Sequence, residues 1–174
     1  MKASYTIAIQ LYEEALANGQ DANECHICGA SITDGLKGCF EQFAELGTKS
    51  YVNPNYGRSY FYGVDAHALQ HPEIHGKKNN AAHLLRLCWL FAYDQHEQSH
   101  LVPKWWQQYL SRAEIPILEP PLFKQRGNIT IATILQAQND EEHLQLMRDW
   151  AESVYQAWQA HHDWAKAELT QIFS

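Results

Sequence analysis

Two cysteines three residues apart, in the segment CHICG at residues 25–29, have the spacing that most directly indicates metal chemistry. Two thiolates at this spacing can bind one Zn2+. Gly29 follows the second cysteine and allows the positive φ of a tight turn that points backbone amides at sulfur. A structural zinc site needs four protein ligands, and the sequence has no second Cys-x-x-Cys pair. The other ligands must therefore come from distant positions.

Cys39 is the candidate for the third ligand, and His67 or His71 for the fourth. The two histidines are four residues apart, so on a helix they lie one turn above each other and both can reach one ion. Two alternatives stay open. Cys39 could be a small core residue in an apolar stretch, and the CHICG thiols could be a redox pair. Redox pairs usually lie between a strand and a helix, a context that this pattern lacks.

A second group of imidazoles could form a different kind of site. His83 opens a helical stretch, and His161 lies on the same helical stripe as Trp150, with His162 beside it. These histidines and His71 could converge on an ion that keeps one position open for water. A buried histidine that is hydrogen-bonded to a tyrosine, an aspartate or a backbone carbonyl is a common alternative.

Apolar residues recur at steps of three and four along most of the chain, which predicts helices. We expect helices at residues 5–16, 36–46, 61–71, 80–96, 104–110, 131–138 and 140–172, with Gly47 and Pro72 as stops and loops at 50–60 and 115–123. The last of these should be the longest helix. The pattern therefore predicts an all-α fold, a single helical bundle over residues 1–174 with a cysteine-rich N-terminal loop clamped to one end.

Composition and charge limit the possible partners and the compartment. The chain has 174 residues, 45% of them hydrophobic, which suffices for one core without disulfides. Its net charge of −7 and few adjacent basic residues argue against nucleic acid and membrane surfaces. No segment resembles a signal peptide or a membrane span, so we expect a cytoplasmic protein. Thiols stay reduced there, which favours the cysteines as metal ligands.

The order of motifs along the chain is CHICG, then Cys39, VDAHALQHP, AAHLLRLCWLF and WAESVYQAWQAHH. This order resembles a family of small bacterial proteins classed only as a domain of unknown function. The most specific parts of the resemblance are Gln70-His71-Pro72, His83-Leu84, and Ala157-Trp158 with His161-His162. The resemblance supports these positions as a set and implies no activity. Helical bundles with histidine-bound metal, such as the DinB-like proteins, are an analogy of fold only, and this chain lacks an obvious equivalent of their ligand order.

Two functional classes follow from these patterns. In the first, which we favour, a structural Zn2+ stabilises a binding or interaction module, with Trp105, Trp106 and Tyr109 as an exposed surface for a protein partner. In the second, a metal-dependent hydrolase or transferase binds a small molecule in a cleft lined by Trp158 and Tyr62. The number of protein ligands distinguishes the two classes, because a closed structural ion has four and a catalytic ion has three with a water.

Overall fold

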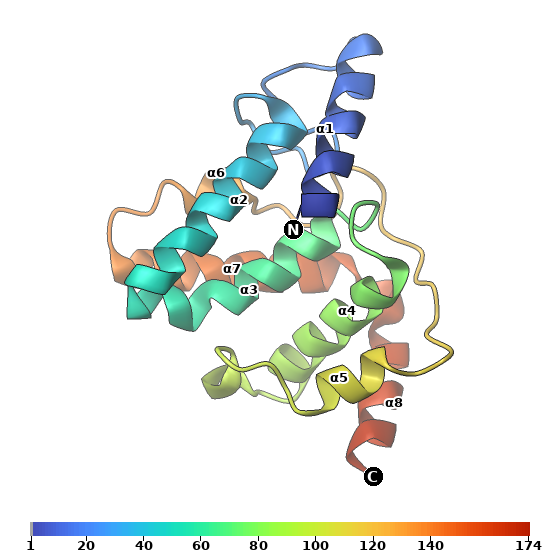
Figure 1. Cartoon of the computed structure of the whole chain (residues 1–174). Helices are drawn as coiled ribbons and strands as arrows, with labels where there is room; N and C mark the ends of the chain where they lie inside the picture. The colour runs from blue at the N-terminus through green and yellow to red at the C-terminus, as the bar shows by residue number, and fades with distance from the viewer. Residues whose placement is uncertain (1) are drawn as a thin grey trace.

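The computed structural model describes residues 2–174, and its regular structure is helical, so the predicted all-α fold is confirmed (Figure 1). In these residues the only β pairing is one isolated bridge, between Glu24 and Ser31. The helices are α1 (Lys2–Ala17), α2 (Gly35–Val52), α3 (Pro54–Gln70), α4 (Lys77–Ala92), α5 (Trp105–Leu110), α6 (Ile131–Ile134), α7 (Asp140–Ala157) and α8 (His162–Phe173), with short 3₁₀ turns η1 (His96–Gln98) and η2 (Gln159–His161).

Helix α3 is the element around which the others are arranged. It packs against α2 on one side, α4 on another and α7 along its length (Figure 1). Helix α1 packs on α2, and α8 packs on α4. The helix that carries both candidate histidines, His67 and His71, is therefore held by three neighbours.

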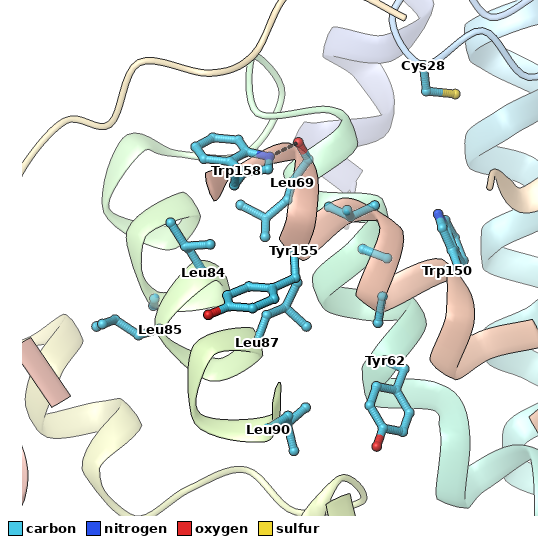
Figure 2. Packing of buried hydrophobic residues seen from close by; sticks show 14 of the residues in the cluster. Cys28, Tyr62, Leu69, Leu84, Leu85, Leu87, Leu90, Trp150, Tyr155 and Trp158 are labelled. Atoms are coloured by element: carbon cyan, nitrogen blue, oxygen red, sulfur yellow. Dashed lines mark hydrogen bonds between the residues drawn. The ribbon is translucent and has the colours of Figure 1, made fainter. Parts of the chain in front are cut away.

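The core lies mainly between α3, α4 and α7. Figure 2 shows Leu69, Leu84, Leu87 and Trp158 packed together, and all four are fully buried. The Trp158 ring also donates from Nε1 to the carbonyl oxygen of Leu69 at 3.3 Å. Full burial of a leucine side chain is worth about 1.5–3 kcal/mol. This packing fixes the end of α3 on which the candidate site depends.

The predicted loop at residues 50–60 is wrong, because α2 and α3 are separated by Asn53 alone. Asn53 has an extended backbone, and its side chain accepts a hydrogen bond from the Asn55 amide, while Pro54 takes the first helical position. Gly47 does not end α2 as predicted. A Cβ atom there would lie 2.8 Å from the Tyr60 hydroxyl oxygen, so this glycine leaves room for the Tyr60 side chain against α2.

The predicted long C-terminal helix is two helices. Helix α7 ends at Ala157, the 3₁₀ turn η2 follows, and α8 begins at His162. The apolar stripe continues through the break, so periodicity alone did not reveal it. The change of direction lets α7 pack on α3 while α8 packs on α4.

The remaining helices differ from the predictions mainly at their ends. Helix α3 stops before Pro72 as expected, but α4 spans Lys77–Ala92 rather than residues 80–96. Helix α6 is a single turn, and residues 115–123 form an extended segment as predicted. Within the described residues, no helix combines the length and apolar character needed to cross a membrane.

Candidate metal centre

Four side chains from three parts of the chain meet in one buried cluster. The ligand atoms of Cys25, Cys28, Cys39 and His71 all lie within 4.8 Å of one another, and each residue is at most 4% exposed. Both Cys25 Sγ and Cys39 Sγ lie 3.6 Å from His71 Nε2, and Cys28 Sγ lies 3.9 Å from Cys39 Sγ. Three sulfurs and one imidazole nitrogen at these separations could hold a metal ion.

Three of the six separations in the cluster agree with the edges of a zinc-centred tetrahedron. Zn–S bonds of about 2.3 Å and Zn–N bonds of about 2.0–2.1 Å give sulfur–sulfur edges of about 3.8 Å and sulfur–nitrogen edges of about 3.5 Å. The observed contacts differ from these edges by only about 0.1 Å. The donor set and its geometry therefore fit a four-coordinate ion.

The loop between α1 and α2 forms a tight turn that places its two thiols together. Gly29 has the expected positive φ, +80°, and its amide donates to the Cys25 carbonyl at 2.7 Å. The Cys25 amide donates to the carbonyl of Ala30 at 2.8 Å, which closes the turn. An L side chain would be strained at Gly29. The turn therefore depends on a glycine at this position.

Cys39 reaches this turn because α2 begins directly beside it. Gly38 lies so close to the preceding loop that a Cβ atom would be 1.8 Å from the carbonyl oxygen of Thr33. That oxygen belongs to rigid backbone and cannot move aside cheaply. Gly38 is therefore required for the loop to lie against the first turn of α2, and this contact brings Cys39 next to the other thiols.

His71 ends α3 with its ring oriented by the helix itself. Its Nδ1 lies 2.8 Å from the carbonyl oxygen of His67, so Nδ1–H donates and Nε2 faces the thiols. The sequence left His67 and His71 as alternatives for the fourth ligand. His67 is buried next to the cluster, with Nε2 3.9 Å from Cys39 Sγ, and its ring stacks on Phe43 with centroids 4.2 Å apart. It lies outside the four-residue group.

The ligand side chains of the cluster lie in hydrogen-bond contact, which shifts the pKa values of Cys25, Cys39 and His71. Hydrogen bonds from Cys28 and Cys39 lower the pKa of Cys25, whereas hydrogen bonding with Cys25 and Cys28 raises the pKa of Cys39. Burial lowers the pKa of His71, but the nearby thiolates outweigh it and raise the pKa to about 10. Burial, followed by repulsion from His71, lowers the pKa of His67. A bound metal ion would displace these shared protons.

A buried glutamine next to His71 anchors the end of α3. Gln70 Nε2 donates to the carbonyl oxygens of Arg126 and Ile129, at 3.2 and 2.8 Å, and Gln70 Oε1 accepts from Trp150 Nε1 at 3.0 Å. Arg126 in turn donates to the Gln70 carbonyl at 3.1 Å and pairs with Glu73. No structural role was predicted for these residues. The position of Gln70 directly before a candidate ligand, His71, was the signal available in the sequence, and Arg126 carried none.

The extended segment that follows α5 covers the cysteine turn. The Lys124 amide donates to the Ile27 carbonyl at 2.9 Å, and Lys124 Nζ pairs with Glu24 at 2.9 Å. Residues almost 100 positions apart in the chain therefore enclose the cluster together.

The other predicted imidazoles do not converge on His71. His83 Nδ1 lies 2.8 Å from Asp65 Oδ1, His161 Nε2 lies 2.8 Å from the Glu119 carbonyl, and His162 Nε2 lies 2.8 Å from the Tyr155 carbonyl. Among the described residues, none of the three histidines belongs to a group of side chains that could hold a metal ion. The hydrogen bond to Asp65 keeps the His83 ring away from His71. The break between α7 and α8 turns the rings of His161 and His162 toward backbone carbonyls.

The predicted exposed aromatic surface is also wrong. Trp105 and Tyr109 are buried, at 8% and 1% exposure, and Trp106 packs against the ring of His83 with centroids 5.2 Å apart. The predicted cleft does not form either, because Trp158 is fully buried. Cys88 is a buried core residue, as its apolar neighbours suggested.

Comparison with protein families places the chain in one of them. Residues 23–159 match the family described as Family of unknown function (DUF5946), and the chain belongs to this family. The matched range includes all four residues of the cluster and ends where η2 begins. Comparisons with curated proteins and with solved structures gave no match.

Proposed function

We propose that this member of the DUF5946 family binds one structural Zn2+ through Cys25, Cys28, Cys39 and His71, and that it acts as a binding or interaction module. The observation that carries the proposal is a buried group of three sulfurs and one imidazole nitrogen within 4.8 Å of one another, in which three of the six separations match the edges of a zinc-centred tetrahedron. Zinc is favoured over harder ions because thiolate ligands select soft or borderline metals.

A structural role follows from the number and burial of the ligands. Four protein ligands complete a tetrahedral shell and leave no position for a reacting water. A hydrolase or transferase centred on the ion would need an open position, and the histidines that were candidates for such a site have other partners. The ion would stabilise the folded structure. A protein whose metal ion is structural acts by binding partners at its surface.

The ion would join the loop after α1 to α2 and to the end of α3. The loop buries few large apolar side chains, with Ile27 the largest. Metal binding to the native state contributes directly to folding free energy. We therefore expect the ion to maintain the packing of the loop against α2 and α3.

The test is the metal content and stability of the reduced, purified chain. We expect about one zinc per chain by elemental analysis, and we expect Cys25→Ser to lose the metal and lower the melting temperature. Cys88→Ser is the matched control, because it changes an equally buried thiol outside the cluster and should retain the metal. A wild-type chain that purifies without metal, and whose melting is insensitive to added zinc and to chelator, would refute the proposal.

A further inference from the structure

A surface pocket lies at the opposite end of α3 from the cysteine cluster. Its volume is about 530 Å³, within the usual range for small-molecule sites. It is formed by the first half of α3, the first half of α7 and the segment around η1. Its lining residues are Arg58, Tyr62, His96, Glu97, Ser99, His100, Leu144, Gln145 and Arg148.

One wall of this pocket is held in place by buried polar contacts. The Arg86 guanidinium, 2% exposed, donates to the carbonyl oxygens of Ser99 and Leu101 and is itself paired with Asp65. A hydrogen bond of 2.8 Å joins the Tyr62 hydroxyl to His96 Nδ1 across the pocket wall. The wall is therefore preformed, and a ligand would not have to order it.

The charges of the pocket distinguish it from the rest of the surface. Of the five arginines in the chain, Arg86, Arg112 and Arg126 each pair with a carboxylate. The other two, Arg58 and Arg148, have no ion pair with any acidic residue in the part of the chain that the structure describes. Both line this pocket. In a chain of net charge −7, the two unpaired arginines thus face one cavity from two helices.

One carboxylate, Glu97, offsets part of this charge, so the lining keeps an excess of positive charge. Glu97 lines the pocket but forms no ion pair with either arginine in the described chain. Burial, followed by repulsion from Arg148, lowers the pKa of His96, so this ring is protonated less readily than a free imidazole. Leu144, 41% exposed, adds an apolar wall beside the arginines.

We propose that the pocket between α3, η1 and α7 binds a small organic phosphate, with Arg58 and Arg148 holding its phosphate group. Guanidinium groups bind phosphate through paired, charge-assisted hydrogen bonds. Two arginines match a phosphate monoester, which carries about −1.5 to −2 charge at pH 7, better than a monocarboxylate. Leu144 and the Tyr62 ring contact the organic part. This site goes beyond the zinc proposal and uses none of its residues.

The test compares two probes that share a ring and differ in the anion. Phenyl phosphate and benzoate are titrated into zinc-loaded protein at physiological salt, and binding is followed by calorimetry and by 31P NMR for the phosphate. We expect phenyl phosphate to bind more tightly than benzoate. Loss of one charge-assisted contact should weaken phenyl phosphate binding about tenfold in each of Arg58→Gln and Arg148→Gln.

Lys166→Gln is the matched control, since it removes one positive charge from an exposed position on α8. It should leave phenyl phosphate binding unchanged, and zinc content should be equal in all four proteins. The proposal is overturned by any of three results: no phenyl phosphate binding to the wild type, benzoate binding of equal strength, or equal weakening by all three substitutions. None of these results depends on whether zinc is structural.

Discussion

Helix α3 carries two buried polar clusters that satisfy their groups in different ways. In one, Asp65 accepts from His83 and pairs with Arg86, so the negative carboxylate has a positive partner in the protein. In the other, at the C-terminal end of α3, three thiols and His71 contact chiefly one another. The first cluster contains its own counter-charge, and the second contains only groups that bind metals.

The difference lies in charge balance. A buried ion pair offsets desolvation when opposite charges and hydrogen bonds are both present, as they are around Asp65. Among three cysteines and one histidine only His71 can carry a positive charge, and one imidazolium cannot balance three thiolates, which would repel one another. A divalent cation balances such a set. The two clusters should therefore respond differently to metal removal and to charge-changing substitutions.

The largest effect should come from removing the ion. In zinc-loaded protein, a strong chelator should lower the unfolding free energy by about 4 kcal/mol, if free zinc otherwise exceeds its Kd by about a thousandfold. The amides of Cys25 and Gly29, which close the cysteine turn, should lose protection from hydrogen exchange first. Denaturant titrations with and without chelator give the first quantity. Equal curves would mean that the cluster, like the Asp65 cluster, is complete without metal.

Asp65→Asn should have an effect of comparable size. It removes the counter-charge of buried Arg86 and should cost about 3–5 kcal/mol of unfolding free energy, with zinc content unchanged. Glu168→Gln is the matched control, because it breaks a more exposed pair with Arg112 and should cost less than about 1 kcal/mol. Zinc loss in Asp65→Asn would show that the two clusters on α3 are coupled rather than independent.

Gln70→Ala should destabilise the chain by about 1–3 kcal/mol, because it leaves the buried Trp150 N–H without its acceptor. Thermal unfolding measures this cost. Gln145→Ala, at an exposed position on α7, should stay within about 0.5 kcal/mol of the wild type. If Gln70→Ala behaves like this control, the end of α3 does not need its polar anchor.

Acidification should have a smaller effect, traceable to His75. Burial, followed by repulsion from His83 and His71, lowers the pKa of His75 to about 3 in the folded chain, against 6.5 for the free side chain. Between these values the unfolded chain binds a proton that the folded chain does not, so stability falls as pH drops below 6.5. The loss from this group at pH 5.5 is about 1.4 kcal/mol. In excess zinc, unfolding free energy should fall less steeply for His75→Gln than for the wild type between pH 7.5 and 5.5, and parallel slopes would contradict the assignment.

Periodicity predicted most helices but not how they join. The residues 50–60 contain proline, glycine and asparagine and were predicted as a loop, yet Asn53 ends α2 and caps α3 at once. The break at Trp158 was missed for the opposite reason, because the apolar stripe continues across it. Both errors concern tertiary packing, which overrides local propensity where α2 meets α3 and where the C-terminal segment changes partner from α3 to α4.

For the candidate site, spacing predicted the cysteine turn and its positive-φ Gly29. The sequence could not decide between His67 and His71 because the decision depends on how α3 is rotated about its axis. Both rings lie near Cys39, and it is His71 whose Nδ1 is held by a helix carbonyl. Residues from the extended segment, such as Lys124 and Arg126, were beyond sequence reasoning because nothing in that segment indicates what it covers.

The order of the cluster residues along the chain determines when each ligand becomes available during protein synthesis. Three thiols leave the ribosome first, and the imidazole of His71 follows 32 residues after Cys39. Thiols without a metal are open to oxidation, so the nascent chain is most vulnerable in that interval. Once α3 has emerged, the chain could bind the proposed ion before α7 and α8 have been made. The later helices would then fold onto an N-terminal half that the ion has already ordered.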